Sequence, residues 1–370
     1  MIQARRMQER GGFARRLLVA ALVVACLVAA LVLFGRPNRQ EQQASPTAAR
    51  PEATVPPSNV AAEHAAKNGP REALPAEAWA ILDLDLGRLG QLGTPLSGRL
   101  EALDCDQIPP PRRISVALLA PPARADGGAE GGDELEFLVT STDATAAFRA
   151  CARERMLAGG AVSEPWPGGI DVASRPGGLR LLSSGDGGPM MFASAPSWGT
   201  DALVEVLAGA HPSAARHGHH AALLASMTSA LAPHAPAEDA RPLPPLGDSS
   251  AVLLTVALPN GWVDGLVPPE DAARTPLRFL RAAAWALRDD GLFGLIDCQV
   301  TQDGSGCEAL GRFFEDARDD LLSHAPGDQR SALIDGWSLR ATAPYRLELR
   351  WRIPAEARAR LLTRLVAGAL

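Results

Sequence analysis

Histidines form the densest group of side chains in this sequence that could carry chemistry. His217, His219 and His220 lie in one short stretch, and His211 precedes them. Imidazoles at this spacing can bind zinc, nickel or copper, and they can also respond to pH. No acidic residue or cysteine is interleaved to complete a metal site, so the favoured interpretation is a solvated loop that leads into a helix over residues 220–231. The three clustered histidines are weak metal candidates.

Two carboxylates, Asp83 and Asp85, fall on one face of a strand predicted over residues 79–86. Some hydrolases use a pair of carboxylates for acid–base chemistry. No second acid or base can be placed opposite this pair, so we favour the polar face of a half-exposed strand. The acidic, glycine-rich stretch 126–133 lacks the spacing of a calcium-binding loop and predicts a hairpin loop.

Arginines give the most concentrated one-sided charge on a predicted strand. Arg346, Arg350 and Arg352 share one face of the strand over residues 345–353, together with Glu348. Such a stripe could hold an anionic envelope polymer or an acidic partner protein. The alternative is a solvated face with local ion pairs. We take the three arginines as the preferred interaction surface.

Lysine is nearly absent, and this excludes several enzyme classes. The only lysine is Lys67. A Walker A loop, a Ser-x-x-Lys acylase, a pyridoxal Schiff base and a kinase ATP site all need a lysine in the folded part. No Gly-x-Ser-x-Gly elbow and no His-Glu-x-x-His helix is present either. The sequence therefore contains no catalytic motif, and no cofactor is expected.

Cysteine usage fits an exported protein. Apart from Cys26, the chain has Cys105, Cys151, Cys298 and Cys307, an even number that suits a compartment in which disulfides persist. Three connectivities are possible, and four free thiols are the alternative. We favour Cys105–Cys151 and Cys298–Cys307, because each pair then lies within one half of the exported region.

An unbroken apolar run over residues 17–34 follows a leader with five arginines. As a helix this run would reach about 27 Å, close to the thickness of the bilayer hydrocarbon core. The arginine excess predicts residues 1–16 as a cytoplasmic tail and the remainder outside. A cleaved signal peptide and a lipoprotein signal at Cys26 are alternatives. The Ala, Gly, Pro and Arg content is typical of a GC-rich bacterial genome, so we expect a single-pass inner-membrane protein with a periplasmic C-terminal region.

Composition predicts the domain organisation behind this anchor. Residues 35–75 are rich in Ala and Pro and lack apolar periodicity, which indicates a disordered linker. Two α+β units follow over residues 76–210 and 248–370, joined by a Pro/His-rich connector over residues 211–247. The expected fold class is α+β, with a single transmembrane helix, a flexible linker and two tandem units with mainly antiparallel sheets.

Apolar patterns and caps predict the elements of both units. Strands are expected over 79–86, 114–119, 134–139, 251–258, 292–301 and 345–353, with several shorter ones between 162 and 193. Helices are expected after Ser141–Asp143, over 201–208, from Thr275 to Leu287, from the capping box of Ser305 and Glu308, and after Pro354. Because an order of strands and helices recurs, we predict a tandem duplication.

Three features of the first half resemble a known group of proteins. They are the opening at Trp79, the Cys105 segment ahead of a strand, and the helix with Phe148-x-x-Cys151. They are similar to uncharacterised exported proteins of myxobacterial type, which are anchored by a leader and built of repeated α+β units. The resemblance covers most of residues 76–230 and implies no activity.

The combined features favour binding over catalysis. We expect a membrane-anchored periplasmic protein that binds or scaffolds within the cell envelope. The alternative is an exported hydrolase or metal-dependent enzyme whose site is assembled from distant residues, so enzymatic activity is left open. Expected partners are the lipid bilayer through residues 17–34 and an envelope protein or anionic envelope polymer. Nucleic acid is not expected, because the net charge is −6.

Overall fold

The computed structural model of this 370-residue chain describes residues 69–91, 105, 108–119, 136–185, 188–231, 246–258, 275–301, 305–323, 330 and 333–354. The predicted membrane anchor, Cys26 and the predicted helix after Pro354 lie outside these residues. Among the residues described, no helix has the length and apolar character needed to cross a membrane.

The described chain forms two compact units. We call residues 69–87 and 105–221 the first unit, and residues 88–91 and 222–354 the second unit. Both are α+β, and the strand pairings within each unit are antiparallel. Helices α3 (Leu86–Gln91) and α6 (Gly218–Leu231) contain residues of both units.

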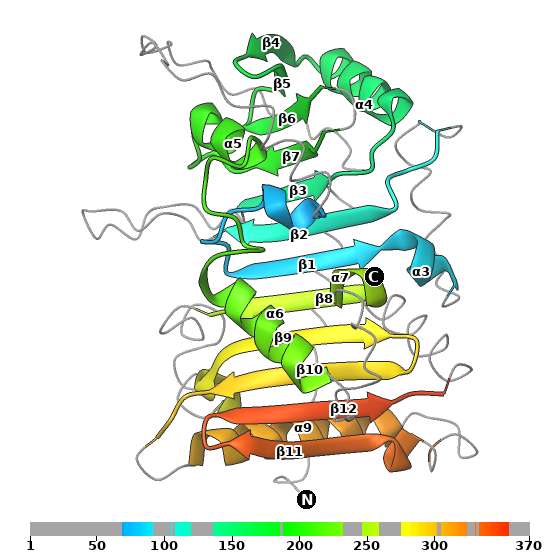
Figure 1. Ribbon diagram of the computed structural model, residues 1–370, viewed down its shortest axis with the longest axis vertical. Helices are drawn as coiled ribbons and strands as arrows, with labels where there is room; N and C mark the ends of the chain where they lie inside the picture. Colours follow the sequence, from blue (N-terminus) through cyan, green and yellow to red (C-terminus); the bar gives the residue numbers. More distant parts are fainter. Residues whose placement is uncertain are drawn as a thin grey trace, which may run out of the picture. The chain divides into compact units, whose positions relative to one another are not determined.

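The sheet of the first unit has the strand order β1-β2-β3-β7-β6-β5-β4. Its strands are β1 (Ala80–Asp85), β2 (Arg113–Leu119), β3 (Glu136–Ser141), β4 (Val162–Trp166), β5 (Ile170–Ser174), β6 (Leu179–Ser184) and β7 (Met190–Ser194), and its further elements are the 3₁₀ turn η1 (Pro70–Ala73), α4 (Ala146–Ala158) and α5 (Thr200–Leu207) (Figure 1). Residues of η1 and α5 pack with one face of the sheet in a common core, which includes Leu74, Ile81, Met191 and Leu203.

Local sequence explains how α4 begins and which side it buries. The Thr145 side chain accepts a hydrogen bond from the backbone N–H of Phe148 at 3.1 Å, which satisfies one of the free donors at the helix start. Phe148, Ala152 and Met156 are buried at helical spacing. Residues 69–75, which the sequence assigns to the linker, also belong to the packed unit, because Leu74 is fully buried.

The sheet of the second unit has the order β8-β9-β10-β12-β11. Its strands are β8 (Val252–Ala257), β9 (Leu280–Arg288), β10 (Gly291–Cys298), β11 (Trp337–Ala343) and β12 (Arg346–Arg352), and its further elements are α7 (Leu246–Ser249), the 3₁₀ turn η4 (Pro276–Phe279) and α9 (Ser305–Ser323). α6 and α9 pack on opposite faces of this sheet (Figure 1). Met227 of α6 contacts the face with Leu295, whereas Leu310 of α9 contacts the face with Ile296.

One predicted helix is wrong. Residues 280–288 form strand β9, and only Pro276–Phe279 turn helically, with the Thr275 hydroxyl accepting from the Leu277 N–H. Both faces of β9 are covered, so its side chains do not alternate between apolar and polar. Alanines occupy both faces of β9, and the spacing of its leucines resembles the apolar spacing of a helix.

The two units share a chain path. In the first, the meander β1-β2-β3 is followed by α4 and then by β4 to β7, of which β7 returns to pair with β3. In the second, the meander β8-β9-β10 is followed by α9 and then by β11 and β12, of which β12 returns to pair with β10. This likeness lies in topology and differs from the element order that the sequence suggested.

Both favoured disulfides are present. Cys105 joins Cys151 of α4 across 46 positions, with Cα atoms 6.3 Å apart. Cys298, at the end of β10, joins Cys307 in the first turn of α9 across 9 positions, with Cα atoms 5.3 Å apart. Each unit therefore has one disulfide that holds its principal helix, and the predicted pairing is confirmed.

Candidate interaction site

Alternate residues of β12 divide between a core face and an exposed face. Leu347, Leu349 and Trp351 are buried in clusters with residues of α9 or of the chain that follows it. The opposite face carries charge, because side chains alternate along a strand. We call this set the arginine face; it comprises Arg346, Glu348, Arg350 and Arg352 of β12 together with Arg340 of β11.

Arg346 is neutralised on its own sheet. Its guanidinium donates two hydrogen bonds to Asp297 of β10, at 2.5 Å and 2.8 Å. These bonds favour the charged form and raise the pKa of Arg346 above its ordinary value. Asp297 and Arg346 are directly opposite in the β10–β12 register. A pairing of this kind cannot be read from the sequence, because it depends on which strand lies beside β12.

Glu348 is shared between two arginines. It is buried and accepts hydrogen bonds from Arg340 at 3.0 Å and from Arg350 at 2.6 Å. Burial alone would raise the pKa of Glu348, but the bonds from both guanidinium groups outweigh it and hold the pKa below its ordinary value. One carboxylate therefore balances only one of two positive charges.

Arg350 is further positioned by its surroundings. Its guanidinium donates to the carbonyl oxygen of Ala230 in α6 at 3.0 Å and lies 5.3 Å from the ring centroid of Phe293. Such stacking on an aromatic ring contributes on the order of 0.5–1 kcal/mol at exposed sites. The side chain is therefore held in place although it is exposed.

Arg352 differs from the other members of the arginine face. Its side chain is exposed, and its guanidinium has no ion pair or hydrogen bond among the residues that the structure describes. Among the residues with a described position, the four arginines of this face are paired with Asp297 and Glu348 alone, which leaves a local net charge of +2. This excess is notable because the whole chain has a net charge of −6.

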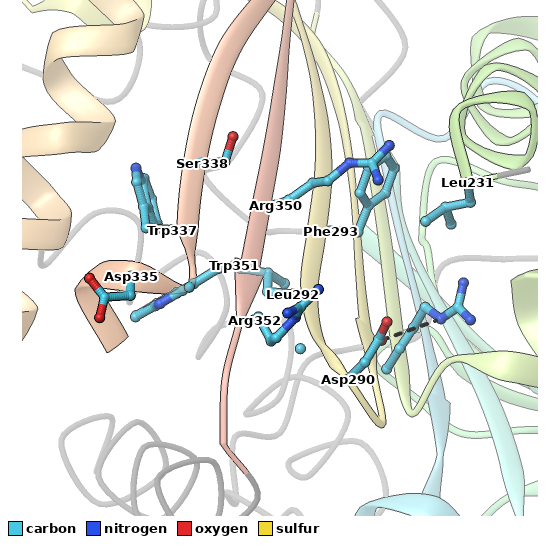
Figure 2. A pocket seen from close by; sticks show the side chains of 13 residues that line it. Leu231, Asp290, Leu292, Phe293, Asp335, Trp337, Ser338, Arg350, Trp351 and Arg352 are labelled. Atoms are coloured by element: carbon cyan, nitrogen blue, oxygen red, sulfur yellow. Dashed lines mark ion pairs between the residues drawn. The ribbon is translucent and has the colours of Figure 1, made fainter. Parts of the chain in front are cut away.

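A cleft of about 340 Å³ opens where β11 begins and β12 ends. Figure 2 shows its lining, with Arg350 against Phe293, and with Arg352 and Trp351 alternating along β12. The lining residues are Leu231, Arg288, Asp290, Gly291, Leu292, Phe293, Asp335, Gly336, Trp337, Ser338, Arg350, Trp351 and Arg352. The cleft thus combines three arginines with two aspartates and several aromatic groups, and two of the three predicted interaction arginines line it.

A glycine keeps the β9–β10 turn close to β12. Gly291 has a φ of +141°, and a Cβ atom there would collide with the carbonyl oxygen of Trp351. Beside it, Arg288 and Asp290 form an ion pair with 3.8 Å between N and O. The turn therefore forms one wall of the cleft.

The structure separates the candidate histidines. His211 lies 3.0 Å from Glu77, whereas His217 and His219 are exposed. His220 is fully buried, with Nε2 at 2.5 Å from the carbonyl oxygen of Ala78. Among the residues that the structure describes, no group of three or more His, Cys, Asp or Glu could hold a metal ion.

Burial dominates the titration of His220. Removal from water disfavours the imidazolium form and lowers the pKa of His220 to about 4; the backbone bond to Ala78 opposes this shift, and the charge of Arg71 adds to it. His220 is therefore neutral near pH 7. The sequence gives no signal that distinguishes it from its exposed neighbour His219.

Asp83 of β1 belongs to a polar cluster in the first unit, which we define by Arg71, Asp83 and Ser115. Arg71 contacts Asp83 Oδ2 at 2.7 Å and 2.9 Å, and the Ser115 hydroxyl donates to Asp83 Oδ1. Asp85 shares this face, with 3.7 Å to Arg113. The sequence placed both aspartates on one face but missed Arg71, which it assigned to the linker.

Comparisons with known proteins give no family. No protein-family model and no curated protein matches the chain. The solved structures that match include crystal forms III, IV and I of TP0453. Their TM-scores are 0.41, 0.42 and 0.41, at 11%, 12% and 12% identity. The matches cover 80% of this chain in each case, and 97%, 96% and 97% of TP0453.

Proposed function

We propose that this protein is a non-catalytic binding protein of the bacterial cell envelope, and that its arginine face and the adjoining cleft bind an acidic partner protein. In this proposal residues 17–34 anchor the chain in the inner membrane and both units lie in the periplasm. One observation carries the binding role. Arg352 is an exposed cation without a counter-ion among the described residues, on a face of net charge +2.

Binding is favoured over catalysis by the surroundings of the candidate catalytic groups. Asp83 is held by Arg71 and Ser115 inside the first unit, and His220 is buried against a backbone carbonyl. The cleft is lined by arginine, aspartate, serine and apolar residues, without histidine or cysteine. A serine nucleophile there would lack the imidazole base that usually activates it. The alternative of an exported hydrolase has less support.

The lining of the cleft favours a protein over a simple anionic polymer. Leu231, Phe293 and Trp351 contribute apolar surface beside the arginines. Arginine and aromatic residues are the types most enriched at the energetic centre of protein interfaces. A partner with carboxylates and apolar side chains would match both components of the cleft.

The shared chain path supports a further part of this proposal. Both units consist of a three-strand meander, a helix and a returning set of strands, with one disulfide on the helix. We regard them as two copies of one ancestral α+β unit, extended by the hairpin strands β4 and β5 in the first. Two such units behind an anchor would suit a scaffold.

Binding can be tested with acidic and basic polypeptides of defined composition. The full chain in lipid nanodiscs would be titrated into fluorescein-labelled poly-L-glutamate, with poly-L-lysine as the opposite-charge probe. We expect poly-L-glutamate to bind with an affinity that falls with salt, and Arg352→Glu to weaken it by about fivefold or more. Arg330→Glu, an exposed arginine of the same unit outside the cleft, is the matched control.

Two outcomes would overturn the binding proposal. One is equal binding of poly-L-lysine, and the other is an identical loss in the two variants. Topology is tested separately by alkaline phosphatase fused to the C-terminus, which is active only outside the cytoplasm. An inactive phosphatase fusion together with a fluorescent cytoplasmic reporter at the same end would contradict the periplasmic placement.

A further inference from the structure

We propose that the partner binds as an extended strand that pairs with the free edge of β11 and directs acidic side chains toward the arginine face. This inference rests on the proposed binding function and specifies its mode. β11 is the last strand of the second unit's sheet and pairs only with β12 among the described residues. Addition of a peptide to a sheet edge is a general recognition mode.

The hydrogen-bond pattern shows which backbone groups of β11 are unused. The N–H of Arg352 donates to the carbonyl oxygen of Gly336 at 2.8 Å, and these two residues are opposite in the β11–β12 register. In an antiparallel pair, residues alternate between those that bond to the neighbour and those that do not. Ser338 and Arg340 therefore bond toward β12.

The other alternate residues of β11 direct their backbone N–H and C=O groups away from β12. These are Trp337, Leu339 and Ala341, and no described residue bonds to their N–H or C=O groups on the outer side. Open rows of this kind are templates for another strand. Natural edges are usually protected by proline, bulges or charge. β11 contains no proline, and Arg340 is its only charged residue. Its register with β12 shifts between Ala341 and Ala343, so the regular open row runs from Trp337 to Ala341.

Alternation along β11 determines the side chains that an added strand needs. Ser338 and Arg340 lie on the side of the arginine face, whereas Trp337 and Leu339 pack with the apolar clusters on the other side. Directly opposite side chains on adjacent strands contribute about 0.2–1 kcal/mol when their charges are complementary or both are apolar. The matching segment therefore alternates acidic and apolar residues over about seven positions.

Charge argues against a second copy of this chain as the occupant. Pairing β11 with β11 of another molecule would bring two Arg340 side chains and two faces of net charge +2 together. Like charges on adjacent strands destabilise the pairing. Acidic side chains on the added strand would instead lie beside Arg340. The partner is therefore a different segment with carboxylates at alternate positions.

Peptides of equal composition test whether the partner binds by strand addition to β11. A fluorescein-labelled heptapeptide that alternates valine and glutamate would be titrated with the full chain in nanodiscs and followed by anisotropy. The controls are a block-order peptide of the same composition and an alternating peptide whose amides are N-methylated at every second residue. We expect the alternating peptide to bind about tenfold more tightly than either control, because only it forms both the ladder and the charge pairs.

A substitution in β11 tests strand addition from the side of the protein. Ala341→Pro removes an outward N–H without loss of a bond to β12, and proline is tolerated at such edge positions. We expect Ala341→Pro to remove the preference for the alternating peptide, and Ala341→Ser, the matched control, to retain it. Circular dichroism and thermal unfolding of both variants establish that the sheet is intact.

The outcomes separate the two proposals. If Arg352→Glu weakens binding of the alternating and the block peptides equally, and Ala341→Pro leaves both affinities unchanged, strand addition is overturned but the binding of acidic partners is not. If no acidic probe binds, both proposals are overturned. If sedimentation shows a dimer of the wild-type chain that Ala341→Pro abolishes, the occupant is a second copy, and a different partner at this edge is overturned.

Discussion

The two units place their charged residues in opposite ways. The first unit keeps Arg71 and His220 buried and Asp83 half-buried, where Arg71 and Asp83 form an ion pair and His220 stays neutral. The second unit exposes most of its arginine face and leaves Arg352 unpaired among the described residues. Loss of one partner of a buried pair is costly, whereas an exposed arginine can be changed at little cost. The first unit is therefore the more sensitive to substitution, and the second the more available for binding.

The outermost strands differ in the same sense. In the first unit the Arg175 N–H donates to the Leu179 carbonyl, and this pattern, carried through β5, directs the backbone of Ser163 and Pro165 in β4 outward. Proline has no N–H, so the outer side of β4 lacks a donor at Pro165. β11 keeps all of its outward donors. One outer strand thus lacks a backbone donor because of its sequence, whereas the other has no partner on its outer side among the described residues.

Removal of the disulfides should cause the largest losses of stability, and the loss should be greater in the first unit. Replacement of both cysteines of Cys105–Cys151 by serine frees a loop of 46 residues and should lower the free energy of unfolding by about 4 kcal/mol. The same change at Cys298–Cys307 frees a loop of 9 residues and should lower the free energy of unfolding by about 3 kcal/mol. Denaturant unfolding of the two double variants measures both values. A larger loss for Cys298–Cys307 would show that loop length does not set the difference.

Disruption of the polar cluster should have the next largest effect. Asp83→Ala leaves the guanidinium of Arg71, 6% exposed, and the buried Ser115 hydroxyl without their carboxylate, and we expect a loss of about 3 kcal/mol. Asp85→Ala is the matched control on the same strand; its 3.7 Å contact is to the half-buried Arg113, and its expected loss is under about 1 kcal/mol. Equal losses in thermal unfolding would contradict a special role for the cluster.

Acid should destabilise the first unit through His220. The unfolded chain takes up a proton near the ordinary pKa of 6.5, whereas the folded pKa is about 4. Between these values the unfolded state binds more protons, so stability falls as pH falls. We expect a loss of about 2 kcal/mol from this residue between pH 7.5 and pH 5.

The measurement compares two chains across pH. The dependence of unfolding free energy on pH should be shallower in His220→Gln than in the wild type by that amount, whatever the effect of the substitution at pH 7.5. Proton NMR of the imidazole would locate the transition directly. Identical pH profiles for the two chains would show that His220 titrates normally in the folded state.

Sequence patterns predicted the strands that show clear alternation or a run of large apolar residues, and the helix that has a capping signal. β1, β2, β8 and β12 were recognised from alternation or apolar runs, and α9 from its capping box. β9 was taken for a helix, because alanines on both of its covered faces hide the two-residue period. β11, which reads Trp-Ser-Leu-Arg-Ala-Thr-Ala, was not recognised although it alternates. Packing on both faces makes residues 280–288 a strand, and their sequence does not show this. The alternation of β11, in contrast, could have been read from the sequence.

The candidate site was predicted only as far as one strand determines it. Alternation sufficed to place Arg346, Arg350 and Arg352 on one face. Pairing with Asp297 and with Phe293 of β10 depends on which strand lies beside β12, which the sequence does not specify. For the same reason the sequence could not show that Arg352 has no ion pair within the described part of the chain. The binding role of these arginines stays a prediction.

The smallest effect on stability is expected from a substitution that gives the outer side of β4 the backbone donor that β11 has. Pro165→Val restores an outward N–H in β4, and should change the free energy of unfolding by less than about 0.5 kcal/mol, because no existing bond is lost. It should nevertheless promote self-association, detected by sedimentation velocity as an increase in mass with protein concentration. Ser163→Val, which leaves the proline in place, is the matched control and should stay at the mass of the wild type. If Pro165→Val also sediments like the wild type, proline is not what closes this edge, and the contrast between β4 and β11 must arise from the charges beside them.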